Sequence, residues 1–287
     1  MVGTLAAGAL PLRLLGQSPH QPDSKTSLAR LFRDLNDARI AKLMQLQSLD
    51  QGSQFYGGFP NAQGIYFVSS SAWNVLYFAA GLSSPDSEHF QSTEVEHRLE
   101  LAMQFLRNMQ HADGTIDLVS TNFHSPPDTG FVVEPVAMAL GIVRRHQAGQ
   151  LEQFQQAAGE LLESAGRALT HGGVHTPNHR WVVCMALARI HQLLPQDAYT
   201  ARVDQWLGEG IDIDADGQYT ERSTSTYTPL VNRCLITIAR ILNRPELYEP
   251  VRKNLELTQY LVHPNGELVT EISRRQDAVQ RRLACKY

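Results

Sequence analysis

The sequence predicts an all-α protein in which helix hairpins stack side by side into an incomplete (α/α) toroid. Apolar residues recur at the helical period through most of the 287 residues, and strand-like alternation is almost absent outside short pieces. Asp-Gly or Asn-Gly turns follow predicted helices at three places. Helix pairs that cannot bury their apolar faces alone must stack on neighbours, and curved stacking gives a solenoid or a closed toroid.

Amphipathic periodicity marks each helix in turn. The first run is carried by Leu28, Leu31, Phe32 and Leu35. Further helices are expected near residues 72–82, 99–109, 129–148, 151–169, 177–194, 198–208, 230–242 and 246–261. The repeated turns lie at 113–118 (DGTIDL), 216–221 (DGQYTE) and 265–271 (NGELVTE). Glycine supplies the positive φ that such turns require, and Asp or Asn tolerates the neighbouring position.

Composition excludes several classes of partner. With 43% hydrophobic residues the chain can bury a large core. A net charge of −4 gives no general basic field, so nucleic acid and anionic membrane surfaces are not expected partners. An acidic substrate would have to be met by local positive charge. Cys184, Cys234 and Cys285 lack metal-binding spacing, and the first two fall in apolar helical runs, which predicts buried, inert thiols.

The N-terminus is predicted to be separate from the fold. Residues 1–22 contain an apolar stretch of small residues that is too short to span a bilayer and carries Arg13. They are either the remnant of a secretory signal or a disordered arm, and residues 23–287 form the catalytic domain. The first alternative predicts a periplasmic or secreted protein.

Two polar segments that lead into helical patterns carry the candidate catalytic side chains. In 176–181 (TPNHRW), Thr176 is a plausible N-cap and Pro177 suits the first helical position, so Asn178 and His179 fall in the first turn. Free backbone N–H groups and the helix dipole favour an anion there. Tyr227 ends the second segment, 48 residues after His179. An amide, an imidazole and a phenol suit the removal of a carbon-bound proton next to a carboxylate.

A family resemblance rests on these residues. The run 173–181 (GVHTPNHRW), the Asp-Gly-x-Tyr-x-Glu-Arg-Ser segment at 216–223 and Tyr227 resemble the α/α-toroid domain of heparinase II/III-like and related alginate polysaccharide lyases. The similarity extends over roughly residues 110–275. It implies an incomplete toroid that cleaves uronate-containing polysaccharides by β-elimination. Those enzymes continue into a β-sandwich domain, which we expect to be absent from this chain, and they commonly supply a further histidine that has no identifiable match here.

β-Elimination assigns a role to each candidate catalytic residue. The enzyme must neutralise the uronate carboxylate, accept the C5 proton and donate a proton to the leaving oxygen. Asn178, expected to be an exposed first-turn residue, is the candidate neutraliser. Tyr227 is the candidate proton carrier, with Tyr219 as the alternative phenol, and His179 is the base or carboxylate partner. Arg180, Glu221 and Arg222 are expected to support substrate binding.

A second polar loop is expected to contact the sugar. Residues 121–130 carry two prolines, which stiffen the loop. Phe123 can lie against a pyranose face while Asn122, His124 and Asp128 bond hydroxyl groups. The alternative is a rigid loop that only caps the next helix.

Two other functions and a metal site are alternatives to the lyase. His171, His175 and His179 repeat at four-residue spacing, but Gly172, Gly173 and Pro177 break the helix that would align them, so no metal or cofactor is predicted. A glycoside hydrolase would need two carboxyl groups across a sugar bond, with Asp128 and Glu221 as the pair to test. A non-catalytic carbohydrate-binding toroid is favoured if Asn178, His179 and Tyr227 point to different sides. The expected partner is an acidic polysaccharide or oligosaccharide.

Overall fold

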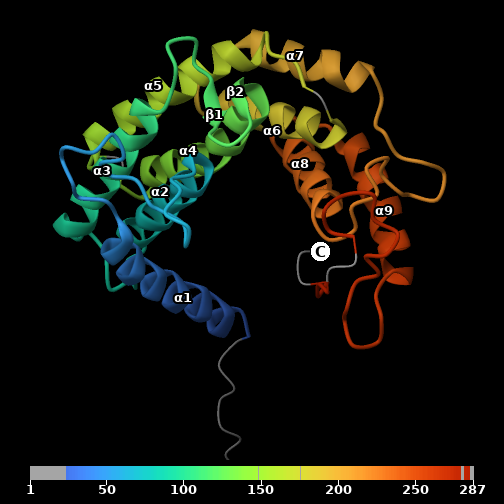
Figure 1. Cartoon of the computed structure of the whole chain (residues 1–287), viewed down its shortest axis with the longest axis horizontal. Helices are drawn as coiled ribbons and strands as arrows, with labels where there is room; N and C mark the ends of the chain where they lie inside the picture. The colour runs from blue at the N-terminus through green and yellow to red at the C-terminus, as the bar shows by residue number, and fades with distance from the viewer. Residues whose placement is uncertain (1–23, 148, 175, 279–280, 285–287) are drawn as a thin grey trace, which may run out of the picture.

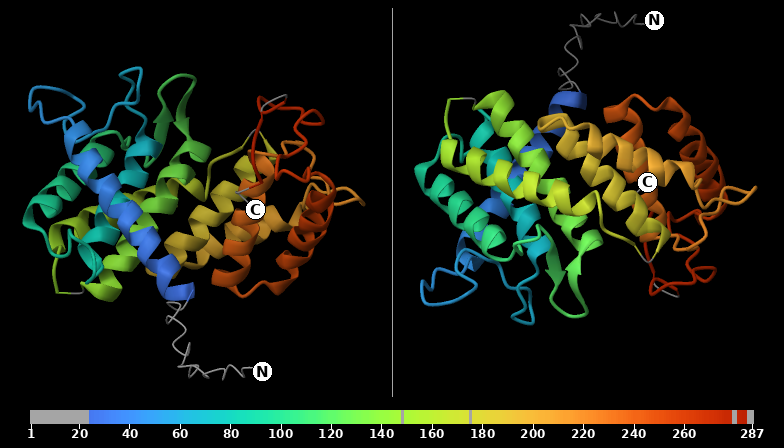
Figure 2. Two further views of the ribbon diagram at one scale, coloured as in Figure 1. Left: turned by 90° about the horizontal axis from the view of Figure 1, so that it is seen from below. Right: turned by 90° about the horizontal axis from the view of Figure 1, so that it is seen from above.

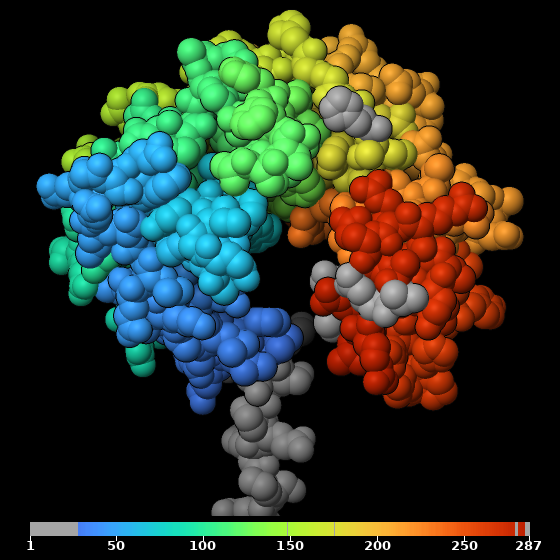
Figure 3. Space-filling model, in the orientation of Figure 1, coloured from blue at the N-terminus to red at the C-terminus, as the bar shows by residue number. Residues whose placement is uncertain are grey.

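The chain curves into an arc of helices that is open on one side (Figures 1 and 3). The structure is a computed structural model that describes residues 24–147, 149–174, 176–278 and 281–284. The predictions for residues 1–22 and for Cys285 therefore lie outside the described residues. Within the described part, no helix combines the length and apolarity needed to cross a membrane.

Two concentric rows of helices form the arc (Figures 1 and 2). The inner row consists of α2 (Val68–Ser83), α4 (Pro126–His146), α6 (Pro177–Leu193) and α8 (Tyr227–Leu242). The outer row consists of α3 (Thr93–Asn108), α5 (Glu152–Leu169), α7 (Asp197–Gly208) and α9 (Tyr248–Tyr260). Each inner helix packs on the next inner helix and on the outer helix that follows it in the chain. This is the arrangement of stacked helix hairpins that the sequence predicts, and the all-α toroid-like fold is confirmed.

A first helix, a 3-10 turn and a short hairpin complete the arc. Helix α1 (Ser24–Leu46) precedes the first hairpin and packs on α2, and a short 3-10 turn, η1 (Pro245–Leu247), leads into α9. Between α3 and α4, β1 (Ile116–Leu118) and β2 (Asn122–Ser125) pair antiparallel with a register irregularity. Strand structure is thus confined, in the described chain, to one short hairpin and isolated bridges.

Burial explains which helices form the inner row. Every residue from Trp181 to Ala188 of α6 is buried, as expected for a helix enclosed by α4, α7 and α8. Helix α1 differs, because its predicted apolar stripe at Leu28, Leu31, Phe32 and Leu35 is more than half exposed, at 52%, 52%, 62% and 57%. The periodicity correctly predicts the helix, whereas the described neighbours of α1 bury only its second half.

In the described residues the repeated turn occurs four times, one copy more than the sequence predicts. Isolated bridges join Pro60 to Tyr66, Gln110 to Ile116, Ile213 to Tyr219 and Val262 to Leu268. Each encloses a glycine at positive φ: Gly64 (77°), Gly114 (89°), Gly217 (93°) and Gly266 (79°). The copy at 60–66 was missed because Gln63, and not Asp or Asn, precedes its glycine. Each turn follows a helix, and the first three lead toward an inner helix.

Replacing the glycine of one of these turns tests how tightly the turn packs on the outer row. A Cβ at Gly114 would lie 2.2 Å from the carbonyl oxygen of Ser164, on α5. Gly114→Ala should therefore lower the free energy of unfolding by about 2–4 kcal/mol, since overpacking adds to the strain of a positive φ. Gly266→Ala is the matched control, because it has a similar φ and nothing within 4 Å, and it should cost about 1 kcal/mol. Equal losses in denaturant titrations of the two variants would contradict this account of the packing.

Candidate active site

The inner helices all begin on the same face of the arc. They alternate with outer helices that return in the opposite direction, so the N-terminal ends of α4, α6 and α8 lie on this one face. Figure 2 shows the β1–β2 hairpin and the chain after α9 projecting from this face as well. Helix N-termini present free backbone N–H groups and a positive dipole end, which favour anions. The candidate catalytic residues Asn178, His179 and Tyr227 all belong to these first turns.

Glu221 supplies an anion to the N-terminus of α6. Its carboxylate accepts hydrogen bonds from the Asn178 backbone N–H (3.1 Å) and from the Asn178 side-chain amide (2.7 Å). Arg275 also donates to it at 3.0 Å. Thr176 occupies the N-cap position as predicted, but its side chain accepts from the Asn178 amide and does not cap the helix. Glu221 therefore takes over the capping role, and its side chain is only 8% exposed.

This network corrects the expectation for Asn178. The sequence predicts an exposed amide in the first turn, able to bind a sugar carboxylate, whereas Asn178 is completely buried. Its N–H groups are committed to Glu221 and Thr176. Local helix geometry could not show this, because the residue that covers Asn178 comes from a segment 43 positions later.

Tyr227 lies on the other side of the same network. It is the first residue of α8 and is half-buried. The phenolic oxygen accepts a short hydrogen bond from the Gln276 side-chain amide, and the Arg275 guanidinium lies 4.7 Å from the ring centroid. Arg275 thus contacts both Tyr227 and Glu221, and through Glu221 it joins Tyr227 to Asn178. Two of the three candidate catalytic residues are brought together in this way.

The imidazole of His179 lies next to Asn178 in the first turn of α6. It is half-buried, and its ring meets Phe131 of α4 edge to face, with 6.2 Å between centroids. The aromatic edge limits the directions in which the imidazole can turn. His179 consequently faces the interval between α4 and α6.

The two arginines predicted as supports have different surroundings. Arg180 is 6% exposed and binds Glu209 at 3.0 Å, the carbonyl of Gly210 at 2.9 Å and Asp212 at 2.5 Å. It ties the end of α7 to α6 and has little surface for a substrate. Arg222 adopts a positive φ of 49°, and its carbonyl accepts from the Arg274 backbone N–H. Its backbone therefore joins the loop before α8 to the segment after α9.

Sequence reasoning missed the importance of the segment after α9. Asp277 is 1% exposed, and its carboxylate accepts hydrogen bonds from Ser223, Ser225 and Ser273. These bonds fix the turn that precedes Tyr227. Ser223 in turn accepts the Tyr227 backbone N–H at 3.0 Å. The signal available in the sequence was the polar run 273–277 (SRRQD), which carries two arginines and an aspartate.

The β1–β2 hairpin holds a second polar cluster. The Asp113 carboxylate accepts a hydrogen bond from Nδ1 of His124 at 2.7 Å, and the His124 ring stacks on His111 at 3.9 Å between centroids. His111 is bonded to Asp117 at 2.8 Å, which gives two imidazoles that each have a carboxylate partner. Hydrogen bonds from Thr115, the largest cause, lower the pKa of Asp113 to about 2. His111, Asp113 and Asp117 were not among the predicted site residues, although they flank the recognised Asp-Gly turn.

The predicted sugar-contacting residues follow this hairpin. Phe123 is 70% exposed, and Asn122 is half-buried in β2. Asp128 accepts from the Ser125 hydroxyl at 2.5 Å, while Ser125 caps α4. The hydrogen bonds that join His124 to Asp113 and Asp128 to Ser125 lie around the hairpin and the first turn of α4. Their cluster is therefore distinct from the network around Tyr227.

Three other predictions concern residues outside the site. Tyr219, the alternative phenol, is 4% exposed and donates its hydroxyl to Asn232 at 2.8 Å, so it is part of the packing between α8 and the preceding turn. Cys184 and Cys234 are free and buried as predicted, and burial raises the pKa of Cys184 to about 12. His175 lies outside the described residues. Among the described ones, no group of three or more metal-ligating side chains is positioned to hold an ion.

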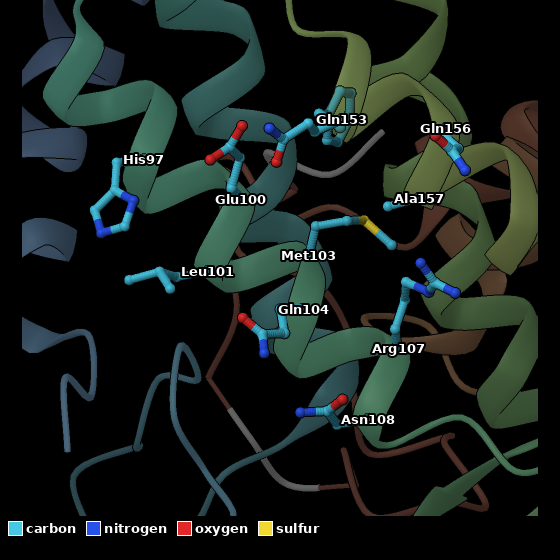
Figure 4. Close-up of a pocket in the computed structure, with 11 residues that line it drawn as sticks. His97, Glu100, Leu101, Met103, Gln104, Arg107, Asn108, Gln153, Gln156 and Ala157 are labelled. Carbon is cyan, nitrogen blue, oxygen red and sulfur yellow. The ribbon is translucent and has the colours of Figure 1, made fainter. Parts of the chain in front are cut away.

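A groove on the outer row is separate from these loops. It has a volume of about 610 Å³ and lies between α3 and α5, where Glu100, Gln104, Arg107 and Gln153 project into it (Figure 4). Outer helices fan apart around a curved inner row, so grooves between them follow from the architecture. The convex position of this groove places it away from the first turns of α6 and α8.

Comparisons with known proteins identify a fold neighbour. No protein-family model and no curated protein sequence matches the chain. A solved sugar epimerase from a ruminal bacterium is similar with a TM-score of 0.57 and 14% sequence identity, over 84% of this chain and 74% of that chain. A solved D-mannose isomerase gives a TM-score of 0.34 at 12% identity, over 86% of this chain and 90% of that chain, which is too low to support an argument. The first likeness shows the fold alone.

Proposed function

We propose that the protein is a carbohydrate-active enzyme, and specifically a polysaccharide lyase that cleaves a uronic-acid-containing polymer or oligomer by β-elimination. The observation that carries the proposal is the position of Tyr227, a half-buried phenol at a helix N-terminus beside a guanidinium. Because the phenolic oxygen accepts from Gln276, its own hydrogen can be donated elsewhere. A phenol so placed suits protonation of the leaving oxygen.

The surrounding residues have complementary roles in this proposal. His179, in the first turn of α6, is the base that accepts the C5 proton. Arg275, about one-third exposed, takes the neutralising role first expected of Asn178, since a guanidinium binds a carboxylate strongly. Asn178 and Glu221 act as positioning residues because they hold Arg275 in place over Tyr227. Losing a preorganised electrostatic contact of this kind typically costs about 10²–10³ in rate.

The fold neighbour and the hairpin also support a second candidate function. A sugar epimerase shares this fold, and epimerisation needs groups that remove and return a proton. The stacked His111 and His124, each with a carboxylate partner, are suited to proton transfer. The hydrolase alternative has less support, because both Glu221 oxygens are engaged by Asn178 and Arg275. A periplasmic or secreted location remains part of the proposal.

A panel of polyuronates tests the proposed function. Elimination creates a carbon–carbon double bond conjugated with the uronate carboxylate, so ultraviolet absorbance should rise in step with new chain ends on at least one polyuronate. Neutral polysaccharides serve as the control and should give no signal. An altered sugar configuration without chain cleavage would select the epimerase and overturn the lyase.

A further inference from the structure

A cluster of side chains crosses the concave interior of the arc. Arg233 of α8 donates to Glu134 of α4 at 3.0 Å, and its guanidinium lies 6.0 Å from the Trp73 ring centroid on α2. Helix α8 packs mainly on α6 and α9, and not along α2 or α4. A side chain that joins α8 to α4 and α2 must therefore reach across the space that the inner row encloses.

The charges in this cluster favour an anion. Glu134 is buried, and the positive charge of Arg189 on α6 acts on its carboxyl group together with that of Arg233. Burial, the largest cause, raises the pKa of Glu134, while the two arginines oppose that shift. Two guanidinium charges therefore act on one carboxyl group, so the local net charge is positive whether or not Glu134 is protonated. In a protein of net charge −4, this is a local positive site inside the arc.

Arg233 also has the surface needed to bind a ligand. Its side chain is 47% exposed, whereas that of Glu134 is 3% exposed. A guanidinium has five N–H donors, and one contact with Glu134 leaves others for a second carboxylate. Trp73, half-buried beside it, can pack its ring against the face of a pyranose.

A groove along α8 includes Arg233 of this cluster and reaches the N-cap of the helix. It has a volume of about 610 Å³ and is lined by Thr226, Leu230, Arg233 and Thr237, among other residues of α8, and by Leu255 of α9. Thr226 precedes Tyr227, and Leu230 lies three residues from both Tyr227 and Arg233. Six residues of helix separate Tyr227 from Arg233 by about 9 Å along the axis, a distance that an oligosaccharide can span.

We propose that Arg233 and Trp73 form a second sugar-binding subsite that recognises a carboxylate on a uronate other than the one that reacts, with Glu134 as the positioning residue for Arg233. This inference rests on the proposed function and narrows its substrate class: the preferred ligand carries acidic groups on more than one sugar. Arg275 binds the carboxylate of the reacting sugar, and Arg233 binds another along the chain. A substrate with a single uronate would use only one of these guanidinium groups.

Binding to a catalytically silent protein tests the inference. In a Tyr227→Phe background, calorimetry would measure the affinity for trimers of glucuronate and of mannuronate, and for their carboxyl-reduced, neutral counterparts. Arg233→Gln should weaken binding of the better acidic trimer about ten-fold or more, since hydrogen bonds to charged groups are strong, and should leave the neutral trimer unaffected. Arg233→Lys should retain part of the affinity because it keeps the charge and loses the planar fork.

A matched control distinguishes a local effect of Arg233 on affinity from the effect of changing the net charge of the protein. Arg252→Gln on α9 removes the same charge from an exposed side chain that is paired with Glu249 and Glu256, and it should leave affinity unchanged. Unchanged binding by folded Arg233→Gln, or an equal loss in Arg252→Gln, would overturn the subsite while leaving the lyase proposal intact. Failure of both acidic trimers to bind the Tyr227→Phe protein would overturn the proposed function as well.

Discussion

Tyr227→Phe should reduce turnover of the best polyuronate by about 10²–10⁴, the usual contribution of a positioned proton donor. The fold should persist, because the lost hydroxyl is bonded to the exposed Gln276 and the ring can still pack under Arg275. Initial rates of double-bond formation, together with thermal unfolding of the same samples, measure both effects. A loss confined to KM would indicate that the phenol only binds substrate.

Tyr219→Phe is the matched control for this substitution. It also removes a phenolic hydroxyl, from a tyrosine eight residues before Tyr227. This hydroxyl is buried and bonded to Asn232. The variant should lose about 1–3 kcal/mol of unfolding free energy, because the side-chain amide oxygen of Asn232 loses a buried donor. Turnover per folded molecule should stay near that of the parent. The opposite pattern, with Tyr219 essential and Tyr227 dispensable, would exchange the roles of the two phenols.

Asp277→Ala should produce a large loss of stability, about 3 kcal/mol or more. The substitution leaves the buried hydroxyl groups of Ser223 and Ser225 and the Ser225 backbone N–H without their acceptor. Because these groups fix the turn before Tyr227, turnover should fall as well. Denaturant titration and hydrogen exchange would measure the global and the local effect, respectively.

Asp214→Ala provides the comparison for Asp277. Asp214 is likewise an acceptor, bonded by the backbone N–H groups of Asp216 and Gln218, but it is exposed, so water can replace it. Its loss should cost about 1 kcal/mol. Similar costs for the two variants would mean that the segment after α9 is only loosely held against the loop before α8.

The sequence was sufficient for the fold because the helical signal is local and repeated. Apolar periodicity places each helix within a few residues, and glycines such as Gly114 and Gly217 mark turns whose positive φ few other residues adopt. The additional turn, at Gly64, is not found by a motif that requires Asp or Asn before the glycine. The periodicity of Leu28 and Leu31 predicts a helix, but it says nothing about which neighbour covers the stripe.

The site could be predicted only in part, because its decisive contacts are long-range. Residue type and first-turn position identify Asn178, His179 and Tyr227 as candidates, and the structure places all three at helix N-termini on one face of the arc. The partner that buries Asn178 is Glu221, and the residue that joins Glu221 to Tyr227 is Arg275. Such pairings depend on how distant loops meet, which no local pattern in the chain encodes.

The most direct test of the account is the mass of the cleavage products formed in heavy-oxygen water. β-Elimination breaks the glycosidic bond without adding water, so the new non-reducing end should be an unsaturated uronate and neither fragment should carry the heavy label from the cleavage step. Fragments that incorporate heavy oxygen on cleavage and lack unsaturation would show hydrolysis. That result would contradict proton abstraction at the His179 and Tyr227 site.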